Sequence, residues 1–111
     1  MNQVSLQYFP PVVPGEKNVL SFNFAAGLAS GNTLSGTPTV TVTTLVGTDT
    51  NPSGILNGSP SLDSTNTIVN VPFYVQNDQN QYLIVVLCGT LNAQVLPGLP
   101  AVLVVNSLSG A

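Results

Sequence analysis

The stretch Gln81 to Thr90 reads QYLIVVLCGT, and every residue from Tyr82 to Cys88 is apolar. Short runs of this kind, rich in Val and Ile and apolar on both faces, are typical of strands at the centre of a sheet or beneath a partner. Ten Gly and nine Pro residues interrupt helical periodicity elsewhere in the chain. The sequence therefore predicts a β protein built around this strand.

Further strands are predicted on both sides of it. Segment 17–24, KNVLSFNF, and segment 37–46, TPTVTVTTLV, alternate apolar and polar residues as half-buried strands do. Pro72, in the predicted strand 66–75, lacks the N–H that a central strand uses, which predicts an edge strand or a bulge there. The remaining short strands are expected at 4–8, 55–62 and 99–105.

About seven strands separated by regular turn signals predict an all-β fold, an immunoglobulin-like antiparallel β-sandwich with an extended N-terminal arm. Residues 1–15 form the proline-rich arm or an edge strand, residues 16–106 the sandwich domain, and residues 107–111 a short tail. The segment DQNQYLI places Asp78 four residues before Tyr82, at the start of the most apolar strand. This spacing resembles a tyrosine corner, in which the hydroxyl of Tyr82 would bond back to the backbone of its own corner and both residues would be structural.

The arm, SLQYFPPVVPGE, interleaves aromatic and branched apolar residues with prolines and is stiff and extended. It forms the first edge strand or lies on a neighbouring subunit, and both arrangements can hold at once. The candidate partner-binding residues are those of its apolar stretch: Tyr8, Phe9, Pro10, Pro11, Val12 and Val13.

The chain is nearly free of charge. Five charged side chains give a net charge of −3, with neither His nor Arg, and the charged fraction is 5% where ordinary domains have about 25%. A neutral surface packs readily against another, so we expect a subunit of an assembly. A single lysine cannot neutralise a phosphate backbone, which argues against a nucleic-acid partner.

Neither secretion nor membrane insertion is indicated. The first fifteen residues have no basic region followed by a continuous apolar one, and the longest apolar runs fall far short of the roughly 18 residues that span a bilayer. Cys88 is interpreted as a buried small hydrophobic residue, because no basic residue lies near it in the sequence to lower its pKa.

The segment Gly47 to Pro60, GTDTNPSGILNGSP, begins like a calcium-binding loop, but Pro60 occupies the place of the bidentate glutamate, so we interpret the segment as a turn. Without histidine, the usual triads cannot form. Asp49 and Asp63 could meet as a carboxylate pair, although exposed turn aspartates are the commoner outcome. We expect no catalytic residues, no metal, no cofactor and no enzymatic activity.

The order of these segments resembles a group of small structural proteins of tailed bacteriophages, described as fiber-tail adaptors or as head or tail accessory proteins. The resemblance covers nearly the whole chain and is carried by FNFAAGLASGNTLSG and by the turn GTDTNPSGILNGSP. It implies an immunoglobulin-like virion component without enzymatic activity. Members often carry Arg or Glu in the penultimate strand and the turn after it, where this chain has no charge.

The resemblance leads to the expectation of a multi-copy adaptor that joins tail fibers to the tail or neck by protein–protein association. Its expected partners are phage tail or neck proteins, the tail fiber and copies of itself in a ring or other multi-copy assembly. Its expected location is the virion, after assembly in the cytoplasm of the host bacterium. A capsid decoration protein that clamps major capsid subunits is the nearest alternative, and a carbohydrate- or cell-surface-binding module is a third.

Overall fold

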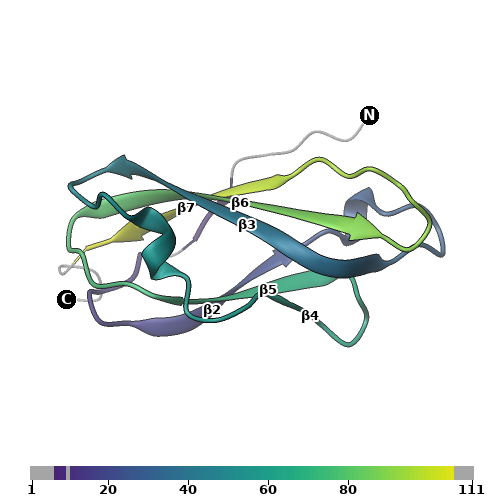
Figure 1. Cartoon of the computed structure of the whole chain (residues 1–111), viewed down its shortest axis with the longest axis horizontal. Helices are drawn as coiled ribbons and strands as arrows, with labels where there is room; N and C mark the ends of the chain where they lie inside the picture. The colour runs from purple at the N-terminus through teal and green to yellow at the C-terminus, as the bar shows by residue number, and fades with distance from the viewer. Residues whose placement is uncertain (1–6, 10, 107–111) are drawn as a thin grey trace.

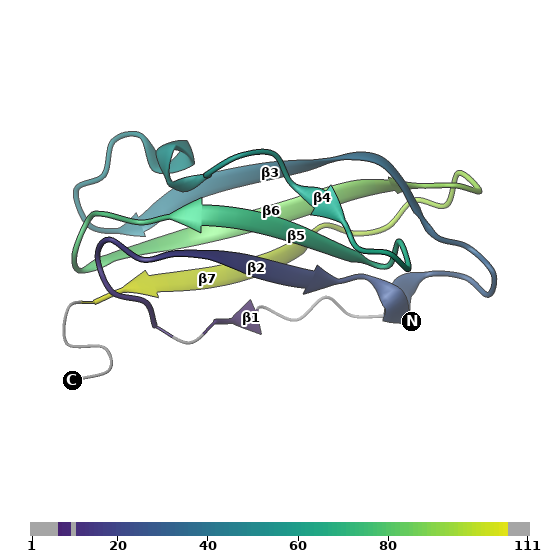
Figure 2. The same ribbon diagram turned by 90° about the horizontal axis from the view of Figure 1, so that it is seen from below.

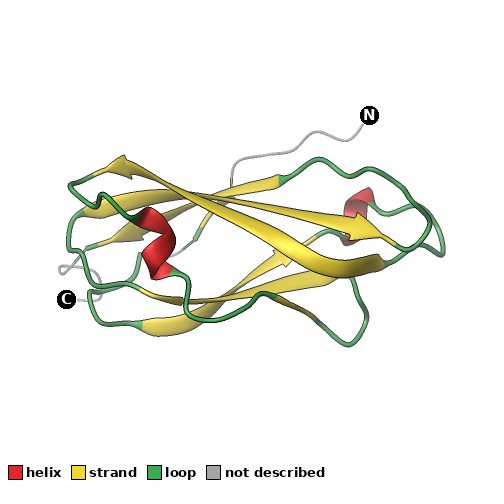
Figure 3. Ribbon diagram, in the orientation of Figure 1, coloured by secondary structure: helices red, strands yellow, loops and turns green. Residues whose placement is uncertain are grey.

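The computed structural model describes residues 7–9 and 11–106 and consists of two β-sheets packed face to face (Figure 1). Two 3₁₀ helices lie toward opposite ends of the sandwich (Figure 3). In chain order the elements are β1 (Gln7–Tyr8), β2 (Lys17–Asn23), η1 (Ala25–Gly27), β3 (Leu34–Val46), η2 (Pro52–Ile55), β4 (Ser61–Leu62), β5 (Ile68–Tyr74), β6 (Asn80–Thr90) and β7 (Leu99–Val105).

The strand order confirms the predicted all-β sandwich. One sheet has the order β1-β7-β6-β3 and the other β2-β5-β4, and all pairs are antiparallel except β1 with β7. With β2 to β7 taken as the second to seventh strands of an immunoglobulin domain, this is the arrangement of that fold. Figure 2 looks onto the three-stranded sheet, with the four-stranded sheet behind it.

The core lies between the sheets and is formed by alternate residues of the facing strands. The most enclosed side chains come from β2, β5, β6 and β7 and from the first residue of β3, and β6 lies between β7 and β3, as its apolar sequence predicts. The largest of them are Tyr82, Phe22, Phe73, Leu34, Ile84 and Leu103. Burial of such side chains contributes about 1.5–3 kcal/mol each before conformational entropy is counted.

The prediction that Pro72 marks an edge strand is wrong, because β5 is the middle strand of its sheet. β4 pairs with β5 only opposite Val69 and Asn70, so it does not reach Pro72. The carbonyl of Pro72 accepts a hydrogen bond from the N–H of Asn57 at 3.0 Å. The N–H and C=O of one residue point to the same side of a strand, so the missing N–H faces this connecting segment and the pairing with β2 is kept.

Candidate interaction surface

The described part of the arm belongs to the sandwich. Gln7 and Tyr8 pair in parallel with β7, and the N–H of Phe9 donates to the carbonyl of Val102 at 3.2 Å. Val12 continues this pairing, since its N–H donates to the carbonyl of Val104 at 2.9 Å. Of the two arrangements left open by the sequence, the structure shows the edge strand.

Two of the six proposed partner-binding residues pack against the sandwich itself. The ring of Phe9 packs edge-on against Phe22, with centroids 5.4 Å apart, and Val12 is buried. Both side chains pack within their own domain, Val12 as a buried residue and Phe9 as a partly buried one, and their role as partner anchors stays a prediction. Pro11 and Val13 are exposed and keep that interpretation, while the side chain of Tyr8 and the whole of Pro10 lie outside what the structure describes.

A shallow cavity of about 210 Å³ separates the arm from β2. Val19, on β2, and Pro11, in the arm, both line it, and Val19 is 51% exposed. The cavity marks the side of the sandwich where β2 has no neighbouring strand. It is lined by Phe9, Pro11, Val12, Glu16, Asn18, Val19, Leu20 and Phe73.

The hydroxyl of Tyr82 does not form the hydrogen bond expected of a tyrosine corner. It donates instead to Oδ2 of Asp49 at 2.7 Å, and Asn77 donates to the same oxygen at 3.1 Å. The other carboxylate oxygen accepts the N–H of Asn51 at 2.8 Å. The reason is geometric: the loop after β3 reaches over the start of β6 and offers a charged acceptor, which binds a hydroxyl more strongly than a backbone carbonyl does. Asp78 contributes its carbonyl, which accepts from Asn80.

These contacts shift the two ionisable groups in opposite directions. The hydroxyl of Tyr82, followed by the N–H of Asn51, holds the pKa of Asp49 below its usual value of 3.8. Burial of Tyr82, together with its hydrogen bond to Asp49, raises the pKa of the phenol to about 12. The carboxylate of Asp49 therefore stays ionised and the phenol of Tyr82 stays protonated at neutral pH, as their hydrogen bond requires.

The carboxylates of Asp49 and Asp63 share no hydrogen-bond partner. Asp63 Oδ1 accepts the N–H groups of Thr67 and Ile68, and Oδ2 accepts the hydroxyl of Thr65 at 2.6 Å. Each carboxylate is thus held within its own network of hydrogen bonds. Within residues 7–9 and 11–106, no three side chains of His, Cys, Asp or Glu come together as metal ligands would.

The opposite end of the sandwich is fixed by Gln94, in the loop between β6 and β7. Its Oε1 accepts the N–H of Ala29 and the side-chain amide of Asn32, both at 2.9 Å, and its Nε2 donates to the carbonyl of Gly27 at 2.7 Å. Asn32 is buried and also accepts the N–H of Asn92. One glutamine therefore ties this loop to the connection between β2 and β3, which lies at the same end (Figure 1).

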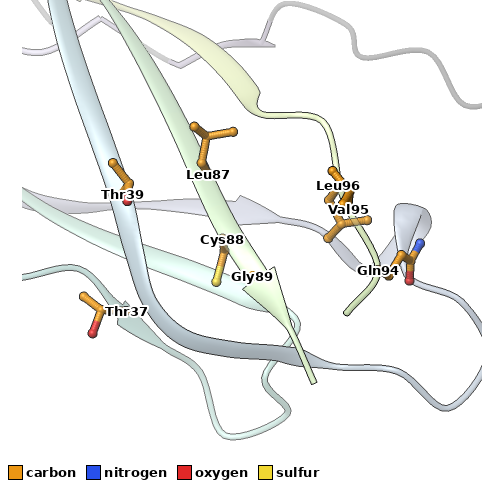
Figure 4. A pocket seen from close by; sticks show the side chains of 8 residues that line it. All are labelled: Thr37, Thr39, Leu87, Cys88, Gly89, Gln94, Val95 and Leu96. Carbon is orange, nitrogen blue, oxygen red and sulfur yellow. The ribbon is translucent and has the colours of Figure 1, made fainter. Parts of the chain in front are cut away.

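Three large apolar side chains are exposed at this end and are called the loop-end patch: Leu87, Leu91 and Val95. Val95 is 92% exposed although the preceding residue, Gln94, is held by hydrogen bonds, and Leu91 is 68% exposed. Leu87 and Val95 line one hollow of about 220 Å³ between β3, β6 and the loop (Figure 4). An ordered loop thus presents apolar surface to the outside without a covering residue in the described chain.

Cys88 lies at the wall of the same hollow and is half-buried, less enclosed than the sequence suggested. Burial raises the pKa of its thiol, so the thiol form predominates at neutral pH. Its Sγ lies 3.8 Å from the carbonyl of Ser35. The residue acts as part of the packing between β6 and β3.

Sequence reasoning did not identify Gln94, Asn32 or the loop-end patch. The segment LNAQVLPG reads as an ordinary turn-rich connection, in which a single Val or Leu carries no periodic signal. The only available indication was the presence of three branched apolar residues, Leu91, Val95 and Leu96, in a connection that otherwise favours turns.

Comparison of the chain with protein-family models, with curated proteins and with solved structures gave no match. No helix in the described ranges is long and apolar enough to cross a membrane.

Proposed function

We propose that the chain is a non-enzymatic structural subunit of a tailed bacteriophage virion, a multi-copy adaptor that joins tail fibers to the tail or neck by protein–protein association. The phage assignment rests on the resemblance described above. The observation that carries the associative mechanism is the loop-end patch, because Val95 projects almost fully exposed from a loop held by Gln94.

The physical argument is one of preorganisation and low desolvation cost. Apolar area buried on association contributes about 25 cal/mol per Å², from which the cost of ordering mobile groups is subtracted. The hydrogen bonds of Gln94 order the loop before binding, which reduces that cost. The patch lies on a chain with only five charged side chains, so few ions would have to lose water when a partner covers it.

A capsid decoration protein would use the same surfaces and differs in copy number and location. A carbohydrate-binding module has one observation in its favour, a polar hollow of about 200 Å³ bordered by Tyr74, Gln76 and Asn77. However, Lys17 lies over the Tyr74 ring, 4.7 Å from its centroid, and Asp49 in the same hollow already accepts three hydrogen bonds. The adaptor is therefore the function that we propose.

The decisive experiment is the copy number of the protein in purified particles, measured by mass spectrometry after heads and tails are separated. A few to a few tens of copies in the tail fraction support the adaptor, in line with a symmetric ring. Hundreds of copies in the head fraction would identify a decoration protein. Absence from both fractions would overturn the virion proposal and favour the binding module.

A matched pair of variants tests the surface itself. Val95→Ser should reduce incorporation into particles, whereas Val46→Ser, which alters an exposed valine at the last residue of β3, should leave incorporation unchanged. Equal incorporation of both variants would remove the loop-end patch from the mechanism.

A further inference from the structure

The free edge of β3 differs from the other three sheet edges of the described structure. β1 and β4 have two residues each, Phe9, Pro10 and Pro11 follow β1 in the sequence, and β2 begins with Lys17. Short strands, prolines and lysines are the usual protection of an edge against pairing. β3 has thirteen residues, with Pro38 and a register shift before Thr39 and a second shift after Thr44, but its segment 39–43, TVTVT, pairs regularly with β6 and contains neither a charge nor a proline.

The backbone along this edge is unpaired on one side. Residues 39–43 pair with β6, and in the described part of the chain none of them forms any other backbone–backbone hydrogen bond. Figure 1 shows β3 crossing in front of β6 near the middle of the molecule. The edge therefore offers a row of N–H and C=O groups to an additional strand.

β3 also has no neighbouring strand on this side within its own sheet, although η2 and β4 contact it from the direction of the other sheet. Val40 and Val42 lie opposite Val86 and Ile84, which are fully buried, yet both valines are only half-buried. They pack against the core as partly buried residues, and β3 is the last strand of its sheet. An added strand with apolar residues at matching positions would cover them.

We propose that this edge pairs with the same edge of a second copy of the chain, antiparallel, about a two-fold axis at Thr41. The segment Thr39 to Thr43 reads TVTVT and is identical in both directions. In this register Thr39 of one copy lies opposite Thr43 of the other, and Val40 lies opposite Val42. The exposed threonines then pair on the outer face and the valines on the core side, as cross-strand pairs in sheets prefer.

The absence of charge favours a second copy over an unrelated strand. When two identical edges meet at a two-fold axis, a charged side chain near the axis lies close to the same side chain of the other copy and is repelled by it. Segment 39–43 carries no charge, so this repulsion does not arise. This pairing also stops at two copies. It joins two sheets of the order β1-β7-β6-β3 through their β3 edges, and the combined sheet then ends on both sides in the short strand β1. A dimer follows and not a filament. This inference rests on the edge alone and is independent of the virion proposal.

The test uses sedimentation equilibrium of the full chain and two double variants. Thr39→Lys with Thr43→Lys places two like-charge pairs across the axis in the proposed register. Thr39→Lys with Thr43→Glu changes the same exposed positions but places each introduced lysine opposite an introduced glutamate of the other copy. Circular dichroism of both variants checks that the sheet is retained.

The unmodified chain and the Lys/Glu variant should sediment as dimers of the 11.4 kDa chain, and the Lys/Lys variant should dissociate at least about tenfold more readily at low salt. A monomeric unmodified chain would overturn the proposal and leave the edge to a strand of another protein. Equal dissociation of the two variants would overturn the proposed register and with it the pairing about Thr41.

Discussion

The hydroxyl of Tyr82 and the carboxylate of Asp49, 33 residues apart in the chain, form a hydrogen bond of 2.7 Å. This bond joins the start of β6 to the loop after β3. It explains why a buried tyrosine stands where a phenylalanine would fill the same space, since a buried hydroxyl needs a partner. It also gives the segment Gly47 to Pro60, which begins like a metal-binding loop, a structural purpose.

Removal of the Tyr82 hydroxyl should destabilise the fold. Tyr82→Phe leaves the carboxylate of Asp49 without its shortest hydrogen bond and should lower the free energy of unfolding by about 1–3 kcal/mol. A double-mutant cycle with Asp49→Asn, followed by urea denaturation, measures the coupling. Strictly additive effects of the two substitutions would contradict a direct interaction.

The same bond predicts an alkaline loss of stability. The pKa of Tyr82 is raised from 10.0 to about 12 in the folded chain, so its contribution to stability is fully present below pH 10 and is lost as the pH rises toward 12. Unfolding free energies measured across this range should fall more steeply for the natural chain than for Tyr82→Phe. Parallel curves would show that the phenol of Tyr82 titrates normally.

An acid loss of stability is predicted from Asp63. The hydroxyl of Thr65, with backbone N–H groups, lowers the pKa of Asp63 from 3.8 to about 2. A carboxylate with a lowered pKa contributes stability that is present above pH 3.8 and is lost as the pH falls toward 2. Thr65→Val should raise this pKa, which NMR titration of the Asp63 carboxyl can follow. An unchanged pKa would assign the shift to the backbone donors alone.

Gly47 should tolerate no side chain. Its φ of +115° is unfavourable for other residues, and a Cβ there would collide with the side chain of Asn80. Gly31 has a φ of +80° but open space around it. Gly47→Ala should therefore reduce the melting temperature clearly more than Gly31→Ala, which carries the backbone strain alone. Similar losses would mean that Asn80 moves aside without cost.

Gln94 should control the order of the loop-end patch. Gln94→Ala removes the acceptor of the Ala29 N–H and the donor to Gly27, so hydrogen exchange at the Ala29 amide should accelerate. Gln76→Ala, at an exposed position at the end of β5, is the control. Unchanged exchange at Ala29 would indicate that backbone pairing alone holds this end.

Several features could be predicted from local sequence because their physical cause is local. Alternation in 17–24 and 37–46 determines which face of each strand is apolar, and the doubly apolar run from Tyr82 to Cys88 is found at the centre of its sheet. The edge prediction for Pro72 failed because β4 is too short to reach Pro72, so the missing N–H costs no hydrogen bond between strands. The length of β4 cannot be inferred from the sequence around Pro72.

The amino-acid sequence by itself determined the β-sandwich class, the positions of most strands and the neutral character of the surface, since periodicity and composition act residue by residue. Only the tertiary structure decided that Val12 is buried with Phe9 packed against Phe22, and that the hydroxyl of Tyr82 bonds Asp49. It also decided that Gln94 fixes the loop from which Val95 projects and that β3 is the last strand of its sheet. Each of these depends on contacts between segments distant in the chain, and such contacts are set by strand order and loop path, which local patterns do not encode.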